Sequence, residues 1–220
     1  DKNMKSILVI GMGRLGRNLA SALLDLGNEV MIVDEREEII EALAPKFPDC
    51  HIGDTTNENV LKSLDVKSFD VVFVTIGTNF ESSLVTTILL KKHGAKKIIA
   101  KASQDIQANI LTTIGADEII FPERDMAQSL AVKYSASNVF DYLELSDEYG
   151  IFEIPVLSYW VGSSIISIDV RKKYKLNIIA VKTGDKMTVS PAADYSFKEN
   201  DHIIVVGKPK DVLKITDRIR

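Results

Sequence analysis

Short runs of branched apolar residues alternate with segments of helical spacing through the first half of the chain. The apolar runs, each of which predicts a strand, lie at 7–10, 30–33, 51–52, 71–74, 98–100 and 119–121. Segments with helical spacing or composition lie between them, at 15–26, 35–44, 57–65, 80–93 and 105–114. Near-continuous Val and Ile runs are typical of strands that are buried on both faces. The alternation therefore predicts an α/β fold in which right-handed βαβ units build a doubly wound parallel sheet.

The pattern changes after Pro122. Segment 123–145 is expected to be mostly helical, and it is too apolar for a flexible tether. Beyond it, branched runs and alternation predict strands at 150–154, 165–170, 178–181, 187–189 and 201–207, followed by a helix that begins at Pro209. We therefore expect a doubly wound domain over 4–122, a helical connection over 123–145 and a small α+β domain over 146–220.

Composition narrows the class of protein. With 220 residues, 45% of them hydrophobic, the chain is large enough to bury a core in one or two domains. The 27 basic and 31 acidic side chains give a formal net charge of −4, which argues against a nucleic-acid-binding protein. Cys50 is the one cysteine, which excludes an internal disulfide and favours a reducing compartment. Because the sequence shows neither a spanning apolar run nor a signal-peptide pattern, we expect a cytoplasmic protein.

A glycine-rich motif gives the strongest chemical signal. Residues 11–16 read Gly-Met-Gly-Arg-Leu-Gly, directly after a predicted strand and at the start of a predicted helix. In such a motif Gly11 permits a tight turn, Gly13 lets the backbone approach a pyrophosphate, and Gly16 allows close packing of helix and strand. The amide groups of the helix N-terminus also favour an anion there. The motif predicts a Rossmann domain that binds the phosphates of a nucleotide, with an empty Rossmann-like domain as the alternative.

An acidic residue closes the second predicted strand. A carboxylate at Asp34 can accept hydrogen bonds from both hydroxyl groups of an adenosine ribose, and it would repel a 2′-phosphate. The predicted ligands are therefore ATP, ADP or NAD(H) rather than NADP.

Polar residues follow the other predicted strands at the same sheet edge, where ligands of open α/β sheets bind. Two of these segments, 53–55 and 75–77, are placed to flank an adenine and its ribose. Asp54 and Thr55 fit a helix cap for the segment at 57 equally well. Lys101 is either a solvated charge or a neighbour of phosphate, and Arg14 is either a solvated residue of the first helical turn or a phosphate partner.

Catalytic groups are harder to find. His93 ends a predicted helix and fits a favourable terminal charge, and His51 and His202 lie in predicted strands, where a structural role is expected. None of the tyrosines precedes a lysine by four residues, and Cys50 beside His51 is too little for a zinc site. We expect a binding protein and no enzyme, with a small NAD-dependent oxidoreductase as the alternative.

Taken together, the motifs resemble the RCK (regulator of K⁺ conductance) proteins of the TrkA/KtrA type. The resemblance is carried by residues 11–16 with Arg14, 52–55, 75–77 with Asn79, 101–102 and 121–123, and in the second half by 178–181 and 201–207. It covers essentially the whole chain, as an N-terminal RCK domain and a C-terminal RCK_C domain. It implies the following nucleotide-binding residues: Gly11, Gly13, Arg14, Leu15, Gly16, Asp34, Glu35, Asp54, Thr55, Thr75, Ile76, Gly77, Asn79, Lys101 and Glu123.

The resemblance also implies a function. Members of this family are cytoplasmic regulatory subunits that gate a potassium channel or transporter of the TrkH/KtrB type in response to ATP, ADP or NAD(H). They form homodimers that assemble into rings, commonly octameric, and segment 123–145 would interlock the dimers. Glu123 would lie near the γ-phosphate and hold a divalent cation, Mg²⁺ or Ca²⁺, and the extra phosphate of ATP would recruit Arg14. A nucleotide sensor with another partner is the remaining alternative.

A second ligand is implied for the C-terminal domain. Some members bind cyclic di-AMP there, and the corresponding residues here are Asp169, Arg171, Asn177 and Ile178. Arg171 suits a phosphate and the isoleucine suits the face of a base. The alternative is that Arg171 belongs to a solvated basic turn over 171–173.

Overall fold

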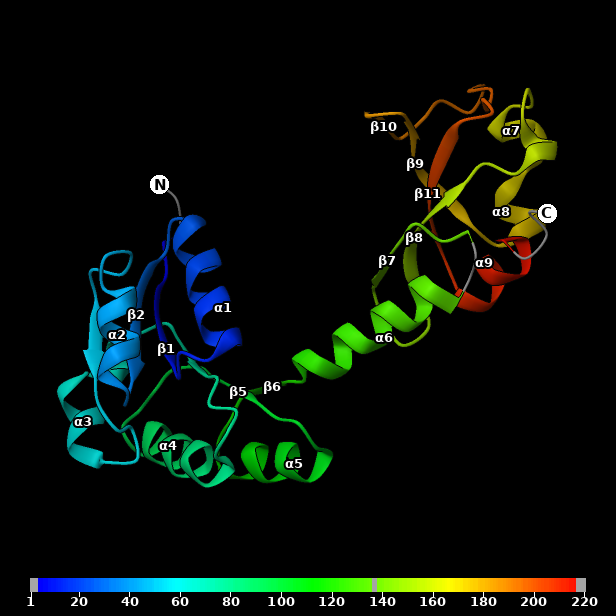
Figure 1. Ribbon diagram of the computed structural model, residues 1–220. Helices are drawn as coiled ribbons and strands as arrows, with labels where there is room; N and C mark the ends of the chain where they lie inside the picture. Colours follow the sequence, from blue (N-terminus) through cyan, green and yellow to red (C-terminus); the bar gives the residue numbers. More distant parts are fainter. Residues whose placement is uncertain (1–3, 136–137, 217–220) are drawn as a thin grey trace. The chain divides into compact units, whose positions relative to one another are not determined.

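The structure is a computed structural model that describes residues 4–135 and 138–216. The chain divides between Arg124 and Asp125 into two compact units, each with its own sheet and its own core (Figure 1). Among the described residues, no helix has both the length and the apolar character needed to cross a bilayer.

The first unit is built on a parallel sheet of six strands in the order β3-β2-β1-β4-β5-β6, counted over the described residues. The strands are β1 Ser6–Ile10, β2 Glu29–Asp34, β3 Cys50–Ile52, β4 Val71–Val74, β5 Ile98–Lys101 and β6 Glu118–Ile120. The helices are α1 Arg14–Asp25, α2 Glu37–Leu43, α3 Glu58–Ser63, α4 Phe80–Lys92 and α5 Asp105–Ile114, with a 3₁₀ turn, η1 Val66–Ser68. This strand order is that of the doubly wound Rossmann fold, so the predicted fold class is confirmed.

Helices cover both faces of this sheet (Figure 1). Successive residues of β1 point to opposite faces, and all of them from Ile7 to Ile10 are at most 3% exposed. Leu8 and Ile10 join the core beneath α3, α4 and α5, whereas Ile7 and Val9 join the core beneath α1 and α2. Burial of such a side chain stabilises the fold by roughly 1.5–3 kcal/mol. The near-continuous apolar strands therefore hold the sheet in the middle layer, with its carboxyl edge free for function.

The second unit contains an antiparallel sheet of five strands in the order β10-β9-β11-β8-β7, counted within the described part of the chain. The strands are β7 Asp141–Glu144, β8 Gly150–Pro155, β9 Asn177–Thr183, β10 Lys186–Val189 and β11 Asp201–Gly207. The helices are α6 Pro122–Ser135, which begins in the first unit, α7 Ile165–Ile168, α8 Val170–Tyr174 and α9 Pro209–Thr216, with a 3₁₀ turn, η2 Ser158–Trp160. Phe152 and Val205 lie in the core with Trp160 and with Val212 of α9.

Two predictions for this half are corrected. The branched run 165–170 is wrong as a strand, because it forms α7 and the start of α8. The Ser164 side chain accepts a hydrogen bond from the Ser167 amide and caps α7, and Asp169 takes a left-handed conformation with φ 52° that separates the two helices. The helix predicted over 123–145 ends earlier, since α6 stops at Ser135 and 141–144 pair with β8 as β7; residues 136–137 lie outside the described residues.

Candidate functional site

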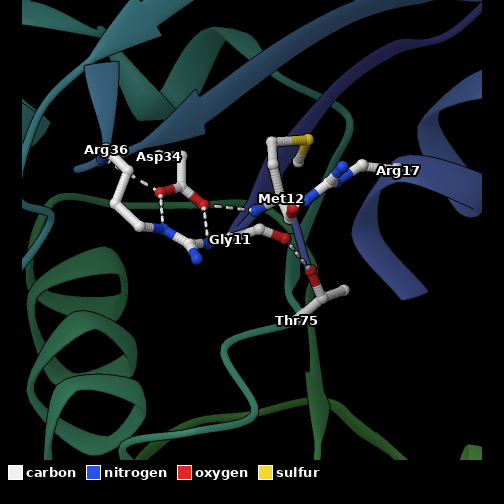
Figure 2. Close-up of polar contacts among 6 residues, drawn as sticks. All are labelled: Gly11, Met12, Arg17, Asp34, Arg36 and Thr75. Carbon is white, nitrogen blue, oxygen red and sulfur yellow. Dashed lines mark hydrogen bonds and ion pairs between the residues drawn. The ribbon is translucent and has the colours of Figure 1, made fainter. Parts of the chain in front are cut away.

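The glycine-rich loop between β1 and α1 is fixed to both neighbouring strands. Gly11 has a φ of +93°, and a Cβ at this position would lie 3.0 Å from the Ile76 nitrogen, so the turn requires glycine. The Gly11 amide donates to the Val33 carbonyl oxygen at 2.8 Å. The Thr75 hydroxyl donates to the Gly11 carbonyl oxygen at 2.7 Å (Figure 2). These contacts hold the loop between β2 and β4.

The other two glycines differ in their surroundings. A Cβ at Gly16 would lie 2.0 Å from the Gly11 carbonyl oxygen, so α1 packs too closely on the loop for any side chain. A Cβ at Gly13 would meet no heavy atom within 4 Å, so the chain is open there. Gly13 is the N-cap of α1 and provides no side-chain cap, and the first turn holds no acidic residue. An open helix N-terminus without a cap fits the phosphate of a nucleotide.

Asp34 lies at the carboxyl end of β2 with its side chain 4% exposed. Its Oδ2 accepts from the Met12 amide at 2.7 Å and from a terminal nitrogen (Nη2) of Arg36 at 2.9 Å. Its Oδ1 accepts from Arg36 Nε at 2.8 Å and from the Arg36 amide at 3.0 Å. Figure 2 shows this two-pronged ion pair beside the glycine-rich loop.

The electrostatics of this pair favour its charged form. Burial opposes ionisation of Asp34, but the hydrogen bonds from Arg36 and from the Met12 amide outweigh it and lower the pKa of the carboxyl. The hydrogen bond to Asp34 also raises the pKa of Arg36. Arg36 was not among the residues predicted for the site. The available signal is an arginine two residues after an acid at a strand end, where a turn brings the two side chains together.

Two arginines belong to α1. Arg17, which is absent from the predicted set, donates from Nε to the Met12 carbonyl oxygen at 2.7 Å and so ties α1 to the loop (Figure 2). Arg14 is exposed in the first turn of α1, and its charge contributes to lowering the pKa of Glu123. Leu15 is partly buried beside it, and Glu35 is exposed after β2.

Lys101 and Glu123 form an ion pair at the far side of the site. Lys101 Nζ lies 2.6 Å from Glu123 Oε1, and it is also 3.3 Å from the position of a Cβ on Gly77. The hydrogen bond from Lys101 is the main cause of the lowered pKa of Glu123. A pocket of about 150 Å³ adjoins the pair and is lined by Ile76, Gly77, Thr78, Phe80, Lys101, Ser103 and Gln107.

Three further residues of the predicted set have local partners. The Asp54 carboxylate accepts from the amide and the hydroxyl of Thr56, at 2.9 and 2.7 Å. The Thr55 hydroxyl lies 2.8 Å from that of Thr86. The helix cap suggested for Asp54 and Thr55 is instead Asn57, whose side chain accepts from the Asn59 amide. Asn79 caps α4 in the same way, by accepting from the Ser82 amide.

The residues expected to bind a second ligand lie together in the second unit. Arg171 donates from a terminal nitrogen (Nη2) to Asn177 Oδ1 at 2.9 Å, and both residues are exposed. Asp169 lies 3.9 Å from Lys172 Nζ, and Ile178 is partly buried at the start of β9. The structure thus brings Arg171 and Asn177 into contact and places a basic run beside them.

Metal-ligating side chains do not gather in the described residues: no three of His, Cys, Asp or Glu converge on one point there. Glu123 is a single carboxylate whose described partner is Lys101. Asp34 and Thr75 both contact the loop over 11–16, and the Lys101–Glu123 pair lies at the end of β5.

Known proteins match both halves of the chain. Residues 7–122 match the TrkA-N domain and residues 150–220 match the TrkA-C domain. Ktr system potassium uptake protein C of Bacillus subtilis (strain 168) is 40% identical over 215 residues, covering 98% of this chain and 97% of the relative. Ktr system potassium uptake protein A of Vibrio alginolyticus is 31% identical over 209 residues, covering 95% and 94%.

Solved structures share the fold. A GsuK channel bound to NAD superposes with a TM-score of 0.67 at 18% identity, covering 100% of this chain and 40% of that one, a likeness that shows the fold alone. The NAD(P)-binding domain of an exopolyphosphatase-related protein from Archaeoglobus fulgidus superposes with a TM-score of 0.54 at 26% identity, covering 60% and 98%.

Proposed function

The chain belongs to the TrkA/KtrA-type family of RCK proteins, and from this membership we propose that it is a nucleotide-responsive regulatory subunit of a membrane potassium channel or transporter. The proposal is supported by relatives that are named as Ktr potassium uptake proteins and that match over nearly their whole length. The location proposed for the subunit is cytoplasmic, at the membrane surface through a TrkH/KtrB-like partner.

The ligand proposed for the first unit is an adenine nucleotide, ATP or ADP, with NAD(H) as the alternative. The observation that carries this proposal is the uncapped N-terminus of α1 above the open position at Gly13, next to the buried carboxylate of Asp34. Phosphates would bind to the amides of the glycine-rich loop, and the ribose hydroxyls to Asp34. A structural neighbour is described as bound to NAD, which fits a nucleotide of this class.

The response to the nucleotide is proposed to pass through Glu123. This residue lies in the first turn of α6, so a charge change near it acts directly on the helix that leaves the first unit. The γ-phosphate of ATP, together with Arg14 and a divalent cation, Mg²⁺ or Ca²⁺, would compete for the charges of Lys101 and Glu123. ADP lacks that phosphate, so the two nucleotides would favour different shapes by their differential affinity.

The assembly proposed is a homodimer that forms a ring. Met126, Leu130 and Tyr134 follow one another at intervals of four along α6 and are 60%, 45% and 77% exposed. Such an exposed apolar row on one helix face suits a second copy of the chain. We retain the division into a nucleotide-binding domain over 4–122, a crossover over 123–145 and a regulatory domain over 146–220 as part of this proposal.

Cyclic di-AMP is the second ligand proposed, in the C-terminal domain. Arg171 and Asn177, which are in contact, would face a phosphate, with Asp169 and Ile178 beside them. The chain is proposed to act by binding and not by catalysis, in keeping with relatives that are named as potassium uptake proteins.

Calorimetry on the purified full-length chain tests the proposal directly. ATP, ADP and NADH are each titrated into the wild type, into Asp34→Ala and into Asp49→Ala, an exposed carboxylate that serves as the matched control. We expect saturable binding that Asp34→Ala weakens at least tenfold, by about 1.4 kcal/mol, and that Asp49→Ala leaves unchanged. Rubidium flux through a Ktr-type membrane subunit, reconstituted with the chain, should then depend on the nucleotide. Absence of any adenine nucleotide binding would overturn the proposal.

A further inference from the structure

The carboxylate of Asp34 has no acceptor position left for a ribose. An ionised carboxylate offers about four lone-pair positions. In this structure four donors occupy them, the amides of Met12 and Arg36 and two nitrogens of the Arg36 guanidinium, at 2.7 to 3.0 Å. A ribose that donates both hydroxyls to Asp34 must therefore displace two of these donors.

The guanidinium of Arg36 is the donor that can leave. The two amides are held by the glycine-rich loop and by the turn before α2, so they cannot move without the backbone. The Arg36 side chain is 48% exposed, and its guanidinium lies at the end of a flexible chain of three methylene groups. Arg36 is the N-cap residue of α2, yet its side chain makes no capping hydrogen bond. The helix therefore does not depend on the guanidinium.

Two other carboxylates lie near the guanidinium of Arg36. Glu35 and Glu38 are both near enough to act electrostatically on Arg36, and both are exposed. An arginine released from Asp34 would remain beside two carboxylates, so its charge would stay compensated. The structure shows the Arg36 side chain on Asp34, and the two glutamates give it a compensated environment if it leaves that position.

We propose that Arg36 is a latch that competes with the nucleotide ribose for Asp34 and so sets the affinity and the sugar selectivity of the site. This inference rests on the proposed binding of an adenine nucleotide. When the latch is closed, the phosphate end of the ligand can reach the glycine-rich loop while the sugar cannot reach Asp34. When it opens, the two ribose hydroxyls replace Arg36 Nε and its terminal nitrogen (Nη2) on Oδ1 and Oδ2.

The direction in which a substitution of Arg36 changes the nucleotide affinity distinguishes a latch from an ordinary ligand contact. Removal of a positive charge near an anionic nucleotide weakens binding by simple electrostatics. Removal of a competitor for Asp34 strengthens it instead. Loss of the bidentate ion pair between Arg36 and Asp34 should change the affinity for the nucleotide by about tenfold.

The experiment measures ADP and 2′-deoxy-ADP binding to the full-length chain by calorimetry. The proteins are the wild type, Arg36→Ala, Arg36→Lys and the control Lys46→Ala, an ion-paired surface cation that is also 48% exposed. We expect Arg36→Ala to bind ADP about tenfold more tightly, with a smaller gain for 2′-deoxy-ADP because that sugar lacks one of the two donors. Arg36→Lys, which keeps the charge but not the fork, should lie between, and Lys46→Ala should match the wild type.

The outcomes are distinct. If the wild type binds ADP and both Arg36 variants bind it equally or more weakly, the latch is overturned while the proposed function stands; weaker binding would make Arg36 a ligand contact instead. Equal gains for ADP and 2′-deoxy-ADP would also overturn it, because the ribose would then not be the competing group. If none of the four proteins binds ADP, the latch fails; if the wild type also binds neither ATP nor NADH, the proposed function fails with it. Melting curves of each variant are compared with that of the wild type to test whether the variant is folded, and we expect Arg36→Lys to be folded.

Discussion

Lys101 and Glu123 join the end of β5 to the first turn of α6 through an ion pair of 2.6 Å. The two partners are unequally exposed, since the Lys101 side chain is 13% exposed and that of Glu123 is 69% exposed. Lys101 is thus the partner that is held in place, and its hydrogen bond lowers the pKa of Glu123. A divalent cation proposed at Glu123 must take this carboxylate from Lys101.

Replacement of Lys101 should therefore strengthen the effect of a divalent cation. In Lys101→Met the Glu123 carboxylate is released, and we expect the ratio of ATP affinities with and without Mg²⁺ to rise several-fold above the wild type. In Glu123→Gln the ratio should fall below the wild-type value, because the carboxylate is lost. Calorimetry with and without Mg²⁺ gives these ratios. A contribution of Lys101 to phosphate binding that is the same in both conditions cancels in the ratio.

The matched control for this series is Lys97→Met. Lys97 Nζ lies 2.9 Å from Glu118, so the variant breaks another ion pair beside the same strand. Its ratio should equal that of the wild type. An identical ratio in all four proteins would mean that no cation binds at Glu123.

Alanine at two neighbouring glycines should separate stability from binding. A Cβ at Gly16 would lie 2.0 Å from the Gly11 carbonyl oxygen and 2.7 Å from the Thr75 hydroxyl. Overpacking against backbone of this kind costs about 1–3 kcal/mol or more. Gly16→Ala should therefore lower the melting temperature by several degrees in the absence of ligand.

Gly13→Ala is its matched partner. The Cβ meets no heavy atom within 4 Å, and the backbone φ of −71° suits any residue. We expect the free energy of unfolding without ligand to fall by no more than about 1 kcal/mol, the cost of replacing an N-cap glycine with alanine. The new methyl group projects where the phosphate would approach, so ATP binding should be lost. A melting temperature of Gly16→Ala as high as that of the wild type would show that α1 tolerates a side chain at Gly16.

The parallel sheet could be predicted because its strands are buried on both faces. Such strands require near-continuous runs of branched apolar residues, a pattern that few other structures require. The same branched residues misled at 165–170. There Ser164 caps a helix and Asp169 adopts a left-handed conformation, and both local effects outweigh the β-propensity of isoleucine. The predicted end of α6 is wrong for a related reason, since residues 141–144 form a strand that pairs with β8.

The site divides in a similar way. The positions of the glycine-rich loop and of Asp34 follow from strand ends, which the sequence reveals. The identity of the residue that pairs with Asp34 does not follow from strand ends, because the pairing with Arg36 depends on a side-chain conformation that is set by the turn after β2. The assignment of the α3 cap to Asn57 instead of Asp54 or Thr55 likewise depends on where the first helical turn begins, which differs by only two or three residues.

The exposed apolar row on α6 leads to a prediction about assembly. Leu130 is the middle residue of this row. A charge there would have to be buried in an interface between two copies, so Leu130→Asp should shift the chain from an oligomer toward a monomer. Gln128→Asp, at a position that is also exposed but on another face of the helix, is the control and should leave the oligomer intact. Analytical ultracentrifugation measures both, and the same mass for both variants would remove this row from the interface.

The second unit contains a buried carboxylate that should make its stability depend on pH. Asp201, which is 0% exposed, accepts from the hydroxyls of Thr183 and Tyr195 and from the Lys198 amide, at 2.6 to 2.8 Å. Burial opposes its ionisation, but these hydrogen bonds outweigh it and lower the pKa of the carboxyl. Asp201→Ala leaves three donors without an acceptor and should cost about 3 kcal/mol at neutral pH.

The sign of the pH effect follows from the lowered pKa. A carboxyl whose pKa is lower in the folded state stabilises the fold above its unfolded value, about 3.9, and loses this contribution as the pH falls through the folded value. The difference in unfolding free energy between wild type and Asp201→Ala should thus be constant from about pH 8 to about pH 5 and narrow below about pH 4. Trp160, the single tryptophan of the chain, is buried in the same core and reports urea unfolding of this unit by fluorescence. The exposed Asp194→Ala is the control, and a difference that widens with falling pH would contradict the role given to Asp201.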